Sequence, residues 1–290
     1  MFTPIKKYVI RWYFLIKPRY IMKKILLWIL AFIITASAAV YQRMTGPTYP
    51  LRGMKDIAGT EVAFRLPRTH VTDKDCEVKI TAADPAIEGT LLYKRFKTED
   101  EWSPVPMERL DDSLKGNLPF QPPAGKLEYK VILSHPSTAE VSLSDDEPVV
   151  IRFKGAVPGF VLLPHVLIMF MAMLFSNRAG IEALRPKGNP RKLVIWTTGL
   201  MIAGGMILGP LVQYYAFGAF WTGFPFGGDM TDNKTLIAVI AWILALIMGR
   251  KGKKARGWVL GASIITLAVY MIPHSLFGSE LDYSKLPAQK

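Results

Sequence analysis

Apolar runs of roughly 17 to 20 residues lie toward both ends of the chain, and a polar segment of roughly 110 residues separates them. An α-helix rises about 1.5 Å per residue, so a run of this length matches the bilayer's hydrocarbon core. The runs are residues 25–41, 158–176, 193–212, 234–249 and 257–276. This pattern predicts a membrane α-helical bundle of about five transmembrane helices and one domain outside the membrane.

The net charge of +13 is confined to three segments that alternate with the apolar runs. They precede the first run, separate the second from the third, and separate the fourth from the fifth. Their cations are Lys6, Lys7, Arg11, Lys17, Arg19, Lys23 and Lys24, then Arg178, Arg185, Lys187, Arg191 and Lys192, then Arg250, Lys251, Lys253, Lys254 and Arg256. All three fall on one side of a membrane if the spans alternate, which is the positive-inside pattern. We therefore expect a bacterial inner (cytoplasmic) membrane protein with a cytoplasmic N-terminus, a periplasmic C-terminus and no nucleic-acid partner.

The first apolar run admits two interpretations. Residues 1–24 are basic and aromatic, which is typical of a cytoplasmic segment lying on anionic lipid. We favour an uncleaved transmembrane anchor at residues 25–41. The alternative is a secretory signal, because Lys23 and Lys24 precede an apolar core that ends at Ala36-Ser37-Ala38. Both interpretations place the next segment outside the cytoplasm.

Residues 42–155 alternate between apolar and polar positions, as half-buried strands do. The alternating sets are Val62/Phe64/Leu66, Cys76/Val78/Ile80, Leu127/Tyr129/Val131/Leu133 and Val149/Ile151/Phe153. Turn residues separate them at 84–85, 121–125 and 145–146. This pattern predicts an extracytoplasmic (periplasmic) antiparallel β-sandwich domain. Cys76, the chain's one cysteine, shares a face with Val78 and Ile80, so we expect a buried core residue.

Within this domain, about residues 55–155, one stretch resembles a fibronectin type III-like or immunoglobulin-like module. The resemblance rests on Leu92-Tyr93-Lys94-Arg95, Trp102, Met107, Leu118-Pro119, Gln121-Pro122-Pro123 and Leu127-Glu128-Tyr129-Lys130-Val131. It covers about a third of the chain. Such modules bind or position partners, so the resemblance implies a partner-binding domain without chemistry of its own.

Residues 156–276 are expected to hold the other four helices, with an outer loop at 213–233 and a periplasmic tail at 277–290. The loop is rich in aromatic residues and glycine, and it ends in a polar stretch. We expect the loop to pack over the outer helix ends near His274, burying Phe217, Phe220, Trp221, Phe224 and Phe226. We then expect a divalent-metal site formed by Asp229, Asp232, His274, Glu280 and Asp282. The simpler interpretation is an aromatic belt followed by a helix cap formed by Thr231, Asp232 and Asn233.

Two histidines lie within apolar runs, and each follows a proline: His165 after Pro164 and His274 after Pro273. A proline frees a helical carbonyl about one turn earlier, and neutral imidazole ligates haem iron or another metal. His165 and His274 are therefore candidate cofactor ligands, with haem b or a divalent metal as the cofactor. The alternative is that each hydrogen-bonds to a neighbouring helix or a freed carbonyl.

Two Gly-xxx-Gly pairs, 205/209 and 257/261, permit close helix packing.

No phosphate-binding loop, dinucleotide fingerprint, haem-attachment motif or zinc-protease motif occurs. We therefore predict no catalytic residues and favour a non-enzymatic protein. Its expected role is an accessory, scaffold or assembly subunit of a membrane protein complex, with the bilayer and other membrane or periplasmic subunits as partners. The first alternative is a haem- or metal-binding redox subunit. The second is an outer-leaflet enzyme or lipid-handling protein built around loop 213–233.

Overall fold

The structure is a computed structural model that describes residues 4–249, 255–274, 276, 278 and 280–285, with side chains from Met22 onward except at 255. Residues 250–254, which carry most of the third basic cluster, lie outside the described residues. Contacts divide the chain into two compact units. The first comprises Met1–Gln42, Leu163–Gly209 and Lys234–Ile272, and the second Arg43–Leu162, Pro210–Asn233 and Pro273–Lys290.

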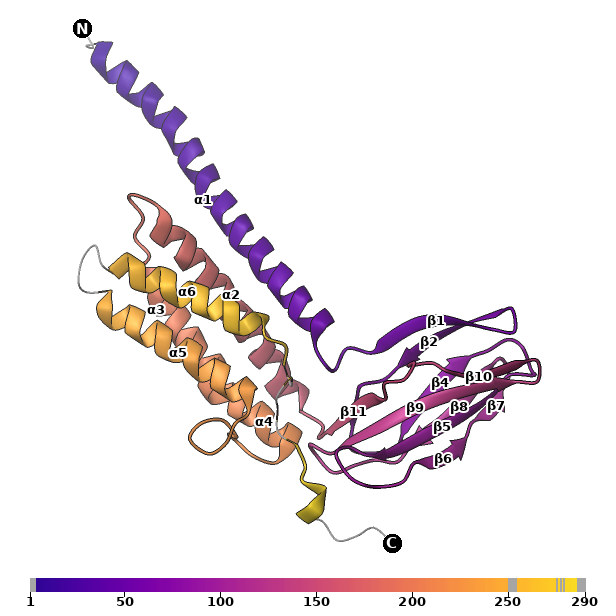
Figure 1. Ribbon diagram of the computed structural model, residues 1–290. Helices are drawn as coiled ribbons and strands as arrows, with labels where there is room; N and C mark the ends of the chain where they lie inside the picture. The colour runs from indigo at the N-terminus through magenta and orange to yellow at the C-terminus, as the bar shows by residue number, and fades with distance from the viewer. Residues whose placement is uncertain (1–3, 250–254, 275, 277, 279, 286–290) are drawn as a thin grey trace. The chain divides into compact units, whose positions relative to one another are not determined.

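Four of the five apolar runs lie almost entirely in helical structure, and the helix of the fifth run, 257–276, ends at Met271 (Figure 1). The helices are α1 (Pro4–Thr45), α2 (Gly159–Leu184), α3 (Arg191–Met201), the π-helix η1 (Ile202–Leu208), α4 (Gly209–Phe217), α5 (Met230–Met248) and α6 (Ala255–Met271). Within the described residues, four stretches are long and apolar enough to cross a membrane: Met22–Thr45, Gly159–Leu184, Arg191–Phe217 and Met230–Met248. Helix α6 is apolar but shorter.

Helix α2 continues two turns beyond its apolar run because its charges pair along one face. The Nη1 atom of Arg178 lies 2.8 Å from Glu182, and Glu182 lies 2.9 Å from Arg185. Pairs three and four residues apart stabilise a helix, so the polar turn stays helical. Arg256 donates from its guanidinium to the carbonyl oxygens of Arg185 and Gly188, which links α6 to the end of α2.

The helical unit has its own buried centre, with Trp242 fully enclosed. The indole Nε1 of Trp242 donates to Thr266 Oγ1 at 2.8 Å, which satisfies the one polar atom of that side chain. Gly205 of η1 lies close to α5, because a Cβ there would stand 2.6 Å from Thr235 Cγ2. The first Gly-xxx-Gly pair therefore contributes Gly205 to packing inside the unit.

The second unit contains eleven strands in two sheets (Figure 1). They are β1 (Leu51–Ile57), β2 (Thr60–Leu66), β3 (Thr69–Val71), β4 (Cys76–Thr81), β5 (Glu88–Arg95), β6 (Ser103–Pro106), β7 (Glu108–Leu110), β8 (Ser113–Leu118), β9 (Lys126–His135), β10 (Thr138–Ser142) and β11 (Val149–Lys154). One sheet has the order β1-β2-β4-β8-β7 and the other β3-β11-β9-β5-β6, with β10 also paired to β9. All pairs are antiparallel except β3 with β11.

The four alternating runs predicted as strands lie in β2, β4, β9 and β11, and their apolar positions are buried. Both sheets contribute to one hydrophobic cluster, whose members all lie between Ile57 and Phe153. Cys76 is buried there as predicted. Burial, with a smaller contribution from Glu77, raises the pKa of its thiol to about 11. The predicted combination of apolar helices and a β domain is therefore confirmed.

Candidate functional site

Two side chains at the start of α5 organise the outer loop. Asp232 Oδ2 accepts the backbone N–H groups of Thr222, at 2.7 Å, and Gly223, at 3.1 Å. Asn233 Oδ1 accepts the N–H of Phe224 at 2.6 Å. Gly223 must lack a side chain, since a Cβ there would lie 2.6 Å from Asp232 Cβ. Residues 222–224 are thus fixed to the first turn of the helix.

Asp229 is the residue that caps α5. Its Oδ1 accepts the N–H of Thr231 at 2.8 Å, and its own N–H donates to Thr222 O at 3.1 Å. The helix begins at Met230, so Asp229 occupies the N-cap position where a carboxylate stabilises exposed N–H groups. The sequence analysis expected the cap at Thr231, Asp232 and Asn233. The structure places the cap at Asp229, and Asp232 and Asn233 instead bind the loop.

The aromatic residues of the loop differ in how far other protein atoms cover them. Phe217 and Trp221 are half-buried, whereas Phe220, Phe224 and Phe226 are 53%, 69% and 81% exposed. Trp221 Nε1 donates to Phe224 O at 3.1 Å, and Tyr214 stacks on Phe220 at 4.4 Å between ring centroids. The backbone hydrogen bonds to Asp232 and Asn233 fix the loop without requiring these rings to pack inside it.

The loop joins the β domain within the second unit. Gly155, just after β11, donates its N–H to Ala216 O at 2.8 Å. The guanidinium carbon of Arg152 lies 4.1 Å from the centroid of the Phe217 ring, close enough for a cation–π contact. We call Arg152, Gly155, Ala216, Phe217 and Asp229 the junction cluster.

Arg152 is almost fully buried, so its charge needs compensation. Burial lowers the pKa of Arg152, and the negative charges of Asp229 and Glu280 oppose that shift. Two of the predicted metal-binding carboxylates therefore lie near the same cation. The negative charges of Asp229 and Glu280 therefore offset part of the cost of burying the Arg152 charge.

The tail after α6 is also part of the second unit. Leu281 donates its N–H to Ala124 O at 3.2 Å, and Lys126 donates its N–H to Tyr283 Oη at 2.9 Å. The Tyr283 hydroxyl lies 2.8 Å from Lys126 O and 3.1 Å from Gln121 Oε1. Glu280 bridges two lysines, Lys126 at 2.6 Å and Lys97 at 2.8 Å. We call Lys97, Gln121, Lys126, Glu280 and Tyr283 the tail clamp.

The electrostatics of the tail clamp follow from these contacts. Partial burial acts to raise the pKa of Glu280, but hydrogen bonds from Lys126 and Lys97 outweigh it and the pKa is lowered. Burial lowers the pKa of Lys126, and its pairing with Glu280 offsets part of that shift. Burial raises the pKa of Tyr283 to about 12, so its hydroxyl stays protonated and able to donate.

Four of the five predicted metal-binding residues contact other groups of the chain. Asp229 and Asp232 accept backbone N–H groups, Glu280 pairs with lysines, and Asp282 contacts Ser284 and Lys285. His274 has an exposed side chain. In the part of the chain that the structure describes, no group of three or more His, Cys, Asp or Glu residues is arranged to hold a metal ion.

His165 lies against the π-helix of the first unit. Its Nδ1 is 3.0 Å from Gly204 O, and because a carbonyl only accepts, Nδ1 carries the proton and Nε2 is the free acceptor. The wider turn of a π-helix exposes such carbonyls and often marks functional positions. His274 belongs to the other unit. A shared haem between the two histidines therefore stays a prediction.

A buried side chain and a half-buried one close the end of α6, and the sequence does not reveal this role. Lys234 Nζ donates to Ile272 O at 2.8 Å, and Gln42 Nε2 donates to Tyr270 O at 2.5 Å. Lys234 is itself buried at this helix end. The last carbonyls of a helix need donors, and those of α6 receive them from α5 and α1.

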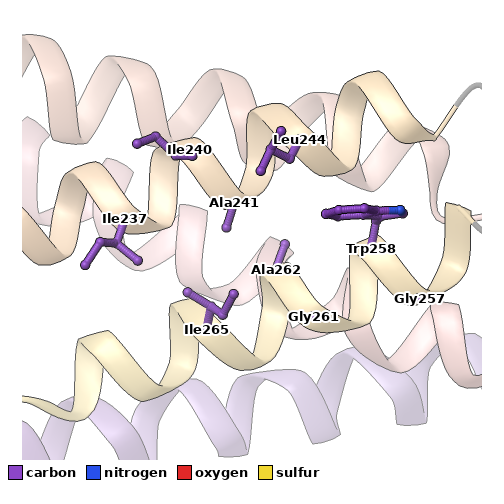
Figure 2. Close-up of a pocket in the computed structure, with 9 residues that line it drawn as sticks. All are labelled: Ile237, Ile240, Ala241, Leu244, Gly257, Trp258, Gly261, Ala262 and Ile265. Atoms are coloured by element: carbon purple, nitrogen blue, oxygen red, sulfur yellow. The ribbon is translucent and has the colours of Figure 1, made fainter.

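An apolar groove of about 830 Å³ runs between α5 and α6 (Figure 2). Ile237, Ile240 and Leu244 line it from α5, and Trp258 and Ile265 line it from α6. Gly257 and Gly261 form part of its floor, and a Cβ at either would meet nothing within 4 Å. The second Gly-xxx-Gly pair is thus open, in contrast to Gly205.

Arg152, Lys126 and Tyr283 belong to the candidate site, and the sequence analysis missed them. Arg152 lies within the alternating run Val149/Ile151/Phe153, at a position where a strand presents its outer face. The sequence signal that could have identified Arg152 is a cation at this position, followed by Lys154. Tyr283 follows the acidic pair Glu280 and Asp282 in a tail too short for a core of its own. No protein-family model and no curated protein matches this chain.

Proposed function

We propose that this chain is a non-enzymatic inner-membrane protein that displays a periplasmic β-sandwich, as an accessory, scaffold or assembly subunit of a membrane complex. One observation carries the proposal. The outer loop and the C-terminal tail belong to the same compact unit as the β domain. Buried Arg152 and the clamp around Tyr283 fasten both segments to it. The β domain, the loop and the tail thus form one compact unit, which suits the binding of a partner.

The strand order supports an immunoglobulin-like interpretation of the β domain. Immunoglobulin constant-type domains have strands A, B, E and D in one sheet and C, F and G in the other. Here β2-β4-β8-β7 follows the first order and β5-β9-β11 the second. The chain departs from antibody domains in having a single cysteine and no tryptophan in β5. What it keeps is the arrangement of two sheets over one core, here completed without a disulfide.

The proposed topology has five spans, with the N-terminus in the cytoplasm and the C-terminus in the periplasm. The positions of the basic clusters support it. Helix α6 is the shortest span at 17 residues, or about 26 Å against a hydrocarbon core of about 30 Å. Reporter fusions after Lys290 and within residues 180–190 test this topology. A cytoplasmic C-terminus would remove one span.

Purification of the full chain in mild detergent, followed by mass spectrometry, tests the scaffold role. We expect at least one membrane or periplasmic protein to be retained in fixed stoichiometry. Strands β1 and β7 are the two edges of the five-stranded sheet and expose Met54 and Leu110. Sheet edges are common docking sites, so Met54→Asp and Leu110→Asp serve as matched variants that show which edge a partner covers. A chain that purifies alone, and forms no cross-links in intact membranes, contradicts the proposal.

One observation favours the redox alternative, namely the orientation of His165. Histidines that ligate metals nearly always donate their other ring N–H to a carbonyl or carboxylate, as His165 Nδ1 does to Gly204 O. A haem or metal ligated by Nε2 would give visible absorption or bound metal that His165→Gln removes. Purified protein with neither signal excludes this alternative.

A further inference from the structure

The outer loop carries an exposed aromatic tip. Phe224 and Phe226, which flank Pro225, are the two most exposed aromatic side chains of the loop. Single exposed apolar residues are common on protein surfaces. Here two phenylalanines, separated only by Pro225, lie on a backbone segment that hydrogen bonds hold in place.

The tip is built as a rigid structure. Phe224 is held from both sides, since its N–H donates to Asn233 Oδ1 and its carbonyl accepts from Trp221 Nε1. The N–H groups of Phe226 and Gly227 both donate to Gly223 O at 2.9 Å. Gly223 is in turn bound to Asp232. The backbone that carries the exposed rings is therefore already ordered, which reduces the ordering cost that a flexible loop incurs on binding.

The depth of the tip follows from its attachment to α5. Phe224 is hydrogen-bonded to Asn233, and the stretch of α5 without charged residues begins at Thr235. At about 1.5 Å per residue, these two positions differ by about 3 Å along the helix axis. The interfacial layer of a bilayer is about 5 to 7 Å thick on each side. A side chain anchored at this level lies at the boundary between head groups and hydrocarbon.

The tip also shares a rigid connection with the β domain. The loop it belongs to is joined to the domain through Gly155 and Ala216, and through Arg152 and Phe217. Any surface that holds the tip thereby restrains the domain. The phenylalanine side chains carry no charge, so the surface they fit is apolar rather than ionic.

We propose that Phe224 and Phe226 insert into the outer leaflet of the bilayer and dock the β-domain unit on the lipid surface. The inference rests on the proposed function for one premise, that the loop lies on the outer face. The lipid interface is the occupant because the chain itself brings the tip there, as the extension of a helix long and apolar enough to span. Aromatic side chains are enriched at this level of membrane proteins.

Spin labelling of the full chain in vesicles of phosphatidylcholine and phosphatidylglycerol in equal parts tests the inference. Phe224→Cys and Phe226→Cys each receive a nitroxide, and Gly228→Cys is the matched aqueous control because a Cβ there meets nothing within 4 Å. These positions are exposed, so the changes leave the fold intact. Cys76 is buried and its thiol stays unreactive near neutral pH, so the wild-type chain is the labelling blank.

We expect labels at 224 and 226 to collide with oxygen more often than with a water-soluble nickel complex, and the label at 228 to show the reverse. Equal nickel accessibility at 226 and 228 overturns the inference. A label at 226 that neither reagent reaches also overturns it, because that result means contact with protein. An impermeant thiol reagent added to spheroplasts carrying Gly228→Cys reports sidedness separately. Failure to react there refutes the proposed topology. The depth measurement tests the insertion of Phe224 and Phe226 independently of that result.

Discussion

At the scale of single residues, the Tyr283 hydroxyl is the most connected group of the tail. It accepts the N–H of Lys126 and faces two acceptors, Lys126 O and Gln121 Oε1. Tyr283→Phe removes the acceptor for a buried N–H, which costs about 1–3 kcal/mol. Hydrogen exchange of the Lys126 amide should speed up and protease should cleave the tail more readily. Tyr129→Phe, which loses a bond to Pro67 O inside the β domain, is the control and should not release the tail selectively.

The tail clamp should also depend on pH through Glu280. Its pKa is lowered in the folded state because hydrogen bonds from Lys126 and Lys97 outweigh the effect of burial. A group with a lowered folded pKa stabilises fully above its unfolded value, about 4.3 for glutamate, and loses that effect as pH falls further. Protection of the tail from protease should therefore decline below about pH 4. In the Glu280→Gln variant this decline should be weaker. If the variant shows the same dependence of protease protection on pH as the wild-type chain, other groups cause the decline.

At the scale of secondary-structure elements, Gly155 sets how closely β11 approaches α4. Its N–H donates to Ala216 O, and an added Cβ would collide with Tyr215 O, a backbone atom that has little room to move. Gly155→Ala should therefore lower stability by about 1–3 kcal/mol, the usual cost of overpacking. Thermal unfolding in detergent measures this. Gly159→Ala is the matched control, since a Cβ at Gly159 meets nothing within 4 Å, and equal effects of both changes would contradict the account.

Elements with a regular apolar period could be predicted from the sequence. The alternation of Leu127, Tyr129, Val131 and Leu133 reports a central strand that the core covers on one face. Edge strands such as β7 and β10 have little buried surface and so leave no period to detect. The end of α2 was missed for a different reason, because its last turns are stabilised by Arg178, Glu182 and Arg185 rather than by apolar residues.

At the scale of the whole molecule, the candidate site depends on contacts that local patterns do not encode. Tyr283 meets Lys126 across 157 positions of sequence. Arg152 is compensated by Asp229 and Glu280, which come from two other segments. The sequence analysis named both carboxylates as candidate metal ligands but did not name Arg152, because their interaction joins segments far apart in the chain.

The β domain should fold without the membrane helices, because every member of its hydrophobic cluster lies between Ile57 and Phe153. A fragment of residues 47–156 also includes β1, which pairs with β2 along its full length. We expect β-type circular dichroism and one cooperative melting transition. A helical or unfolded fragment contradicts this expectation and, with it, the proposed β-sandwich.

The same fragment lacks the loop and the tail, so it should be less stable than the complete unit. Ala124 O, Lys126 N–H and the Lys126 ammonium group lose their tail partners in it. A synthetic peptide of residues 273–290 restores those partners, and anything that binds only the folded state raises its melting temperature. The increase should saturate with peptide concentration and should be smaller for a Tyr283→Phe peptide. A peptide without effect would mean that the tail needs the covalent connection through α6 to reach its site.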